Sequence, residues 1–188
     1  MFLETRNLII ETAKELLVER GYHDLKVADI CRTAGLGKGT FYYYFEHKSQ
    51  LIDIIGMMLI NEIEYQINQL DNQKNTDAMI IDLFNIFIDF SIEKRQIMNN
   101  LLAATSESEW MNSLRTGYKP FRKVIALKLF NDESASSLFK VKYIMGIVDF
   151  YIKEEILDNN ISKDDRILSV YIKMIMSGID SVSENDFK

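Results

Sequence analysis

The segment from residue 35 to residue 48 contains the side chains best suited to chemistry, because three glycines precede a stretch crowded with tyrosines. Tyr and Thr hydroxyls can bond to phosphate oxygens or base edges, lysine attracts phosphate, and glycine lets the backbone approach a partner closely. If Phe41 and Phe45 point into a core, helical geometry directs Tyr43 the opposite way. The segment is then a helix that presents hydroxyls and a lysine to a nucleic acid. The alternative is an aromatic surface helix that docks on its own protein.

Two further helices are expected to position this segment. Apolar residues recur at helical spacing from Thr5 to Arg20, and Gly21 stands where a left-handed residue typically ends a helix. A second, shorter apolar stripe begins near Val27 and stops at Gly35. Two helices, a short glycine-containing turn and a third helix form a helix-turn-helix arrangement, whose last helix lies in the major groove of DNA.

The segment from Thr5 to Leu51 closely resembles the N-terminal domain of TetR-type transcriptional regulators. The resemblance rests on elements in a fixed order, namely Glu19-Arg20-Gly21-Tyr22, Val27-Ala28-Asp29-Ile30-Cys31, Ala34-Gly35-Leu36, Lys38-Gly39-Thr40-Phe41-Tyr42-Tyr43-Tyr44-Phe45, and Lys48 followed by Leu51. It implies a DNA-binding transcriptional regulator, usually a repressor, whose recognition helix runs from about Lys38 to Tyr44.

The resemblance also implies which residues contact DNA. Carried over by position, they are Lys26, Lys38, Gly39, Thr40, Tyr42, Tyr43, Tyr44 and Lys48, the last of them on a phosphate. Three positions depart from the family pattern. Lys26 and His47 replace hydroxyl residues that cap helices, and Gly37 replaces a serine. Because lysine and histidine are poor N-caps, we expect less stable starts for the second and fourth helices.

The charge distribution qualifies this interpretation. The chain has 22 basic and 28 acidic residues, a net charge of −6, which by itself argues against a general nucleic-acid binder. The first 48 residues, however, hold seven basic and seven acidic side chains, and residues 26–48 hold four basic and two acidic ones. This weak positive field predicts binding that depends on specific contacts and on two subunits acting together, and that salt weakens.

Length and composition predict an all-α protein of about nine helices. The chain has 188 residues, of which 47% are hydrophobic, with one proline and eight glycines, and long stretches of it lack an alternating apolar pattern. We expect a helix-turn-helix DNA-binding domain at 1–48, with the motif at about 26–45, and a helical effector-binding and dimerisation domain at 49–188. No apolar run is long enough to cross a membrane, and the single cysteine, Cys31, is expected in the core of a cytoplasmic protein.

Apolar periodicity and polar breaks predict the helices of the second domain. They are expected at about 48–70, 77–94, 96–104, 121–130, 134–157 and 167–179. Ser162 is expected to cap the last of them. Pro120 marks either a kink or a helix start, and the sequence leaves both open.

The family resemblance implies that the two C-terminal helices pair with their copies in a second subunit. Both helices carry apolar residues on more than one side, which would be a liability in a monomer. The residues expected in this homodimer interface are Tyr143, Ile147, Phe150, Tyr171 and Ile175. The alternative is that these side chains complete the core of the single chain.

The central helices are where this family binds a small-molecule effector. Methionine and aromatic side chains could enclose an apolar or aromatic molecule. The candidates are Met58, Tyr65, Phe84, Phe87, Met98, Trp110 and Tyr118, although such stripes are more often ordinary core. We expect a repressor that leaves a palindromic operator when the effector binds, and the alternative is regulation by a protein partner.

Catalysis is not expected. His23 and His47 both lie in the DNA-binding segment, and Cys31 has no expected histidine base, so neither a metal cluster nor an activated nucleophile is available. The glycines at 35–39 follow a helix rather than a strand, unlike a phosphate-binding loop. The sequence therefore predicts no catalytic residue, no metal and no cofactor.

Overall fold

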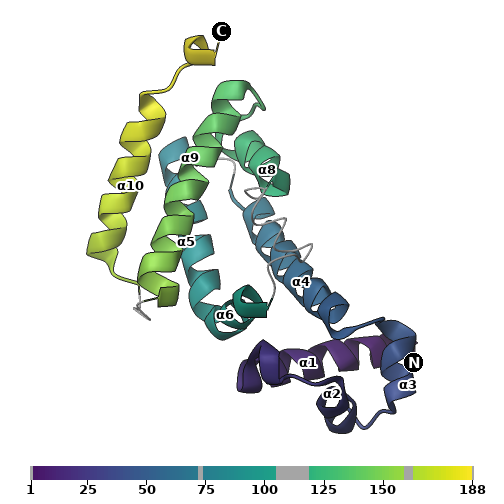
Figure 1. Ribbon diagram of the computed structural model, residues 1–188. Helices are drawn as coiled ribbons and strands as arrows, with labels where there is room; N and C mark the ends of the chain where they lie inside the picture. Colours follow the sequence, from purple (N-terminus) through teal and green to yellow (C-terminus); the bar gives the residue numbers. More distant parts are fainter. Residues whose placement is uncertain (1, 72–73, 105–118, 159–162, 188) are drawn as a thin grey trace. The chain divides into compact units, whose positions relative to one another are not determined.

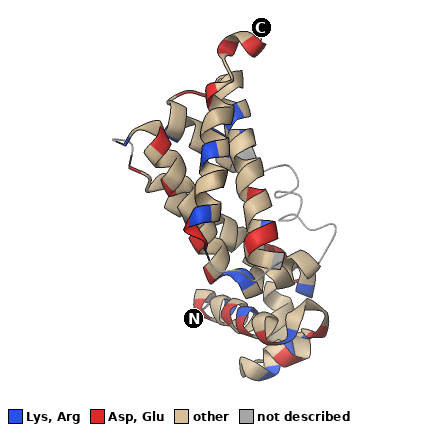
Figure 2. Cartoon of the chain, turned by 90° about the vertical axis from the view of Figure 1, so that its left-hand side faces the viewer, with Lys and Arg blue, Asp and Glu red and all other residues tan. Residues whose placement is uncertain are grey.

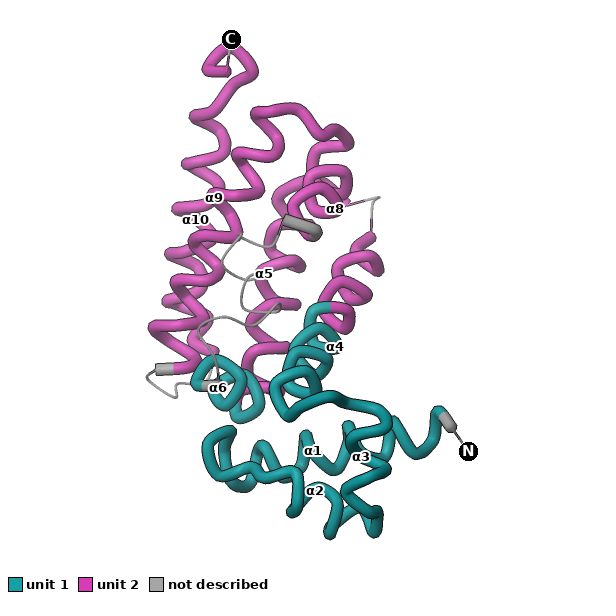
Figure 3. Tube along the Cα trace, turned by 45° about the vertical axis from the view of Figure 1, so that its right-hand side comes forward, with its two compact units in different colours: residues 1–60, 96–112 teal, residues 61–95, 113–188 magenta. Residues whose placement is uncertain are grey.

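The computed structural model describes residues 2–71, 74–104, 119–158 and 163–187 (Figure 1). Within these ranges all the regular structure is helical, and nine α-helices are described, which confirms the predicted all-α fold class. No helix in these ranges is both long enough and apolar enough to span a membrane. The chain forms two compact units, residues 1–60 with 96–112 and residues 61–95 with 113–188 (Figure 3).

The first unit contains α1 (Phe2–Asp24), α2 (Val27–Thr33), α3 (Lys38–Tyr44), the first part of α4 (Lys48–Asn68) and nearly all of α6 (Arg95–Ala104). Its core forms because the apolar stripes of these helices face one another. The buried side chains include Ile9, Ala13, Leu16 and Leu17 of α1, Ile30 and Cys31 of α2, Phe41 of α3, and Leu51, Ile52 and Ile55 of α4. The expected boundary at residue 48 coincides with the start of α4, whereas the compact unit continues to Ile60.

Helix α1 extends beyond its predicted ends and is interrupted at Gly21, whose φ of 74° and ψ of 169° are not helical. Only glycine adopts this backbone conformation readily, so the expectation of a positive φ at this position is confirmed. The carbonyl of Leu17, one turn before the interruption, accepts a hydrogen bond of 2.7 Å from Asn100 Nδ2 on α6. A side chain 83 residues away thus stabilises the end of the regular part of α1.

The turn between α2 and α3 has the geometry that its glycines predict. Gly35 has a φ of 67°, and the backbone N–H of Leu36 donates to the carbonyl of Cys31 at 2.8 Å, which closes the end of α2. Helix α3 begins after Gly37, an N-cap without a side-chain hydrogen bond. The observed bounds of α3 are those predicted for the recognition helix.

The start of α4 corrects one expectation. His47 Nδ1 accepts a hydrogen bond of 3.0 Å from the backbone N–H of Gln50, so this histidine does cap the helix. Gln50 Oε1 in turn accepts from the backbone N–H of Glu46 at 2.8 Å, a reciprocal arrangement close to a capping box. The imidazole nitrogen supplies the acceptor that a hydroxyl usually provides. Lys26, at the start of α2, makes no side-chain cap, as expected.

The second unit contains the remainder of α4, together with α5 (Thr76–Glu93), α8 (Lys119–Phe130), α9 (Ala135–Tyr151) and α10 (Asp165–Asp180). The helix predicted at 134–157 is α9 continued by a π-helical segment, Ile152–Asp158, and a short 3₁₀ segment, Glu184–Phe187, follows α10. Helices α9 and α10 run side by side, and α9 also packs on α8 (Figure 1). Side chains from α5, α8 and α9 fill the core of this unit, among them Leu83, Phe84, Ile125, Val141 and Ile144.

Two helix starts in this unit bear on the sequence predictions. Within the described residues α8 runs from Lys119 and contains Pro120, and the choice between a helix start and a kink there involves residues 105–118, which lie outside the described residues. Helix α10 is capped by Asp164, whose Oδ1 accepts from the backbone N–H groups of Arg166 and Ile167, so Ser162 is not the capping residue. Arg166 also holds the pKa of the Asp164 carboxyl below its usual range by hydrogen bonding.

Candidate nucleic-acid interface

Helix α3 separates its aromatic side chains onto two faces. Phe41 and Phe45 are 0% and 1% exposed and pack against each other with ring centroids 5.5 Å apart. Tyr42 and Tyr43 are 55% and 67% exposed. Burial of the phenylalanines fixes the rotation of the helix, since residues two positions apart on a helix point in opposite directions. The outward orientation of these tyrosines, on which the sequence interpretation depends, is confirmed.

The N-terminal turn of α3 is open. Gly37, Lys38 and Gly39 are exposed, and a Cβ placed on either glycine would meet no atom within 4 Å. Thr40 is partly exposed beside them. A surface without side chains at two of four consecutive positions leaves room for the sugar-phosphate backbone to approach the helix closely.

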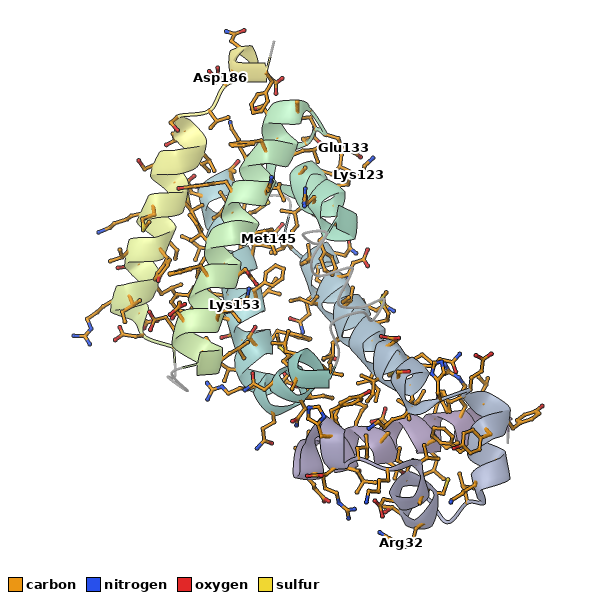
Figure 4. The ribbon with its side chains drawn as sticks, in the orientation of Figure 1. Arg32, Lys123, Glu133, Met145, Lys153 and Asp186 are labelled. Carbon is orange, nitrogen blue, oxygen red and sulfur yellow. The ribbon has the colours of Figure 1, made fainter. Side chains whose placement is uncertain are left out.

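Helix α2 and the residue before it also carry exposed cations. Lys26, the residue before α2, is exposed. The Arg32 side chain is 70% exposed and extends outward from α2 (Figure 4). Asp29, one helical turn earlier, accepts from Arg32 and also pairs with Arg20 of α1 at 3.4 Å. The family resemblance did not include Arg32 among the expected DNA contacts. Its i, i+3 spacing from Asp29 can nevertheless be read in the sequence.

Tyr44 and Lys48 differ from the other predicted contact residues in their surroundings. Tyr44 is only partly exposed, and its ring packs edge-on against Tyr43 at 5.1 Å. Lys48 Nζ donates to the backbone carbonyls of Tyr22 and Leu25 at 2.8 and 3.0 Å, and lies 4.0 Å from the centre of the Tyr22 ring. Burial lowers the pKa of this ammonium group. The structure thus directs Lys48 toward its own protein.

Charge on the first unit is mixed rather than one-sided. Figure 2 shows positions of basic and acidic residues interspersed along its helices. The exposed faces of α2 and α3 nevertheless carry Lys26, Arg32 and Lys38, and the one acidic residue within those two helices, Asp29, is engaged with arginines. Such a surface favours an anionic partner locally without a long-range field.

The predicted effector residues that the structure describes belong to both units and differ in burial. Phe84 and Phe87 are 0% and 4% exposed in the second unit, and the Phe84 ring packs edge-on against Tyr151 at 5.5 Å. Tyr65 and Met58 are exposed on α4, and Met98 of α6 is partly buried. Trp110 and Tyr118 lie outside the described residues.

The predicted dimer residues divide between core and surface. Ile175 is 0% exposed, so its side chain packs inside its own chain and offers no surface to a partner. Tyr143, Ile147 and Tyr171 are partly buried, whereas Phe150 is 54% exposed. Three further apolar side chains on α9 and α10 that periodicity did not single out are exposed, namely Phe139, Val170 and Met174.

Comparison with known proteins agrees with this geometry. Residues 9–54 match the sequence model of the family described as bacterial regulatory proteins, tetR family. Over 181 residues the chain is 25% identical to an uncharacterised HTH-type transcriptional regulator, YvdT of Bacillus subtilis, and the match covers 88% of this chain and 91% of that protein.

Solved structures share the whole fold. A transcriptional regulator from Rhodococcus sp. Rha1 superimposes with a TM-score of 0.73 at 12% identity, covering 92% of this chain and 96% of that one. The transcriptional regulator FadR from Bacillus subtilis, solved in complex with stearoyl-CoA, gives a TM-score of 0.66 at 18% identity. The match covers 91% of this chain and 97% of FadR. At these identities the likeness establishes the fold alone.

Proposed function

Since the chain is a member of the TetR family of bacterial transcriptional regulators and carries its helix-turn-helix DNA-binding domain, we propose that it binds a palindromic operator as a homodimer. On this proposal it represses transcription until a small-molecule effector releases it from the DNA. Homologous proteins are regulators rather than enzymes, which is consistent with the lack of catalytic groups in the sequence.

The observation that carries the proposal is the outward presentation of Tyr42 and Tyr43 over a buried pair of phenylalanines. A recognition helix needs polar side chains that reach base edges while its inner face holds it rigidly. In this proposal Lys38, Thr40, Tyr42 and Tyr43 contact bases or backbone. Gly39 allows the close approach, and Lys26 and Tyr44 contact the phosphate backbone.

Dimerisation follows from the weak charge of one DNA-binding unit. A single short helix buries little surface in a groove, whereas two of them held about one DNA turn apart read a palindrome together. The exposed apolar residues Phe139, Phe150, Val170 and Met174 on the paired helices α9 and α10 supply a surface that a second copy would cover.

The effector part of the proposal rests on the second unit. Its core is rich in large apolar side chains, among them Phe84 and Phe87, that could rearrange around an apolar or aromatic molecule. FadR, which shares the fold, binds stearoyl-CoA. If a ligand of this kind favours the form that does not bind DNA, operator and ligand must oppose each other with equal coupling, typically about 1–3 kcal/mol.

The contact residues are tested by Thr40→Ala and Tyr42→Phe, each of which removes one hydroxyl from α3. Each is expected to weaken binding to an operator by about 1–3 kcal/mol, or roughly 5- to 150-fold, with fold and dimer intact. Ser169→Ala removes an exposed hydroxyl from α10 and serves as the control. Unchanged affinity for both α3 variants would refute the residue assignment.

Effector release is tested in a purified system. Stearoyl-CoA and a set of aromatic compounds are titrated into the protein with and without operator duplex. A compound that binds more weakly in the presence of the operator supports the small-molecule mechanism. Release only by a cell fraction that contains protein would favour a protein partner instead.

A further inference from the structure

We propose that Lys48 is a positioning residue, an internal tie that fixes the helix-turn-helix between α1 and α4, rather than an anchor on a DNA phosphate. This inference rests on the proposed DNA-binding function, because it concerns how the same recognition helix is held. It assigns Lys48 a different role from the one that its place in the family motif implies.

The first step is the set of contacts around the ammonium group. Lys48 Nζ donates to the carbonyl oxygen of Tyr22 at 2.8 Å and to that of Leu25 at 3.0 Å. It also lies 4.0 Å from the centre of the Tyr22 ring, within the range of a cation–π interaction. An ammonium group has three donor hydrogens, and the two carbonyl oxygens occupy two of them. A phosphate would have to share this ammonium with the carbonyls or displace it from them.

The second step is where those carbonyls lie in the chain. Tyr22 follows the interruption of α1 at Gly21, and Leu25 immediately precedes the first residue of the helix-turn-helix. Carbonyls in this position lack the partners that a continuing helix would supply. The backbone N–H of Leu25 donates to the carbonyl of Gly21 at 3.2 Å, and the Leu25 side chain is 1% exposed. The link between α1 and α2 is therefore held by a backbone hydrogen bond and by a buried side chain, in addition to Lys48.

The third step is the other end of the tie. Lys48 is the first residue of α4 and stands three residues after Phe45, the C-cap of α3, which is 1% exposed. One side chain therefore joins Leu25, two residues before α2, to the start of α4 just after α3. Because both ends of the helix-turn-helix are attached to the same group, its orientation relative to α1 and α4 depends on that group. Loss of the tie would alter the angle at which α3 presents its tyrosines.

The partly buried environment agrees with this role. The Lys48 contacts are partly buried, and burial lowers the pKa of its ammonium group. A lysine that serves as a phosphate anchor is more useful when its charge is solvent-exposed and free to reach the DNA. Lys38, at the start of α3, is exposed and provides the comparison within the same unit.

The test compares Lys48→Met, which keeps an unbranched apolar stem and removes every donor, with the matched change Lys38→Met. Thermal unfolding of the full chain is measured first. We expect Lys48→Met to lower the unfolding midpoint by about 4 °C or more, and Lys38→Met to shift it by no more than about 2 °C.

Binding to a random-sequence duplex is then measured as a function of salt concentration. Each phosphate contact contributes about 0.9 to the slope of log affinity against log salt concentration. We expect Lys38→Met to reduce the slope by about this amount and Lys48→Met to leave it unchanged. Lys48→Met is also expected to reduce the preference for a selected operator over the random duplex by about tenfold, because α3 is no longer held at the correct angle.

A slope reduced by about 0.9 in Lys48→Met, or an unfolding midpoint equal to that of the wild type, would overturn the proposal. If Lys48→Met does not fold, ¹³C NMR titration of the Lys48 side chain in the wild-type protein decides the matter. A tie keeps a pKa below that of exposed lysines with and without duplex DNA, whereas a phosphate anchor shows a pKa that DNA raises. If the wild type binds no duplex, the proposed function fails, and the thermal comparison still decides whether Lys48 is a tie.

Discussion

The phenol ring of Tyr143 on α9 lies directly against Gly178 on α10. A Cβ at position 178 would overlap two ring carbons and the hydroxyl oxygen of Tyr143. The same hydroxyl donates to the backbone carbonyl of Met174 at 3.1 Å. A side chain at position 178 would therefore displace the Tyr143 ring, and the glycine lets this ring lie against α10.

Gly178→Ala is expected to destabilise the protein even though alanine favours a helix. The new methyl group forces the Tyr143 ring to move and breaks its hydrogen bond to α10, for a cost of about 1–3 kcal/mol in the free energy of unfolding. Lys173→Ala, an exposed change on the same helix, is the control and should remain within about 0.5 kcal/mol of the wild type. Urea unfolding measures the stability of both variants. A Gly178→Ala protein as stable as the wild type would show that the Tyr143 ring moves aside without a cost in stability.

Aspartate at exposed apolar positions of α9 and α10 is expected to dissociate the proposed dimer. Phe150 and Met174 are 54% and 51% exposed, so Phe150→Asp and Met174→Asp should leave each chain folded while placing charges in a desolvated interface. Leu127→Asp, on exposed residue 127 of α8, controls for the general effect of a new charge. Sedimentation velocity should show monomers for Phe150→Asp and Met174→Asp and dimers for Leu127→Asp. If all three variants are equally dimeric, the interface does not involve these faces of α9 and α10.

Lys26→Ser should separate stability from DNA affinity. Serine supplies the N-cap that α2 lacks, which is worth about 0.5–2 kcal/mol of stability. Loss of the lysine should reduce the salt slope of DNA binding by about 0.9 if Lys26 contacts a phosphate. Thermal unfolding and a salt titration on one duplex measure the two effects. A more stable variant with an unchanged salt slope of DNA binding would show that Lys26 does not contact a DNA phosphate.

The stability contributed by Asp164 is expected to depend on pH. Arg166 and the first backbone N–H groups of α10 hold the pKa of this carboxyl below its usual range. A carboxyl with a lowered pKa in the folded state stabilises the protein above the unfolded-state pKa of about 3.9 and loses that contribution as the pH falls. Asp164→Asn retains a capping oxygen but no charge.

The unfolding midpoints of wild type and Asp164→Asn should therefore differ most at neutral pH and converge in acid. Thermal unfolding over a range of pH values from neutral to about 3 covers the ordinary titration of a carboxyl. A difference that stays constant, or that grows on acidification, would mean that the charge of Asp164 is not what stabilises the start of α10.

Much of the first unit could be predicted from the sequence because its signals are local. The four-residue spacing of Phe41 and Phe45 fixes the rotation of α3, and the positive φ values fall at glycines 21 and 35, where the apolar stripes end. Lys48 could not be placed in this way, since its partners lie 23 and 26 residues earlier in the chain. They meet only in the folded chain, where the start of α4 contacts the end of α1 and the link to α2.

The second unit was harder to predict because α9 and α10 are apolar on several sides. Periodicity cannot distinguish a side that faces the chain's own core from one that faces a second subunit. Ile175 accordingly proved to be buried, whereas Val170, one turn or so earlier on the same helix, is exposed. The capping role of His47 was also missed, because acceptance by an imidazole nitrogen depends on a ring orientation that the sequence does not encode.

The central claim is tested most directly by selecting duplexes from a random-sequence library. The selection is run once with the wild-type chain and once with a variant in which Tyr42 and Tyr43 are both alanine. The wild type should enrich a palindrome with half-sites about one DNA turn, or a multiple of it, apart. The variant should fold and dimerise but enrich nothing beyond the starting library. Failure of the wild type to enrich any sequence, or enrichment of the same palindrome by the variant, would contradict the account.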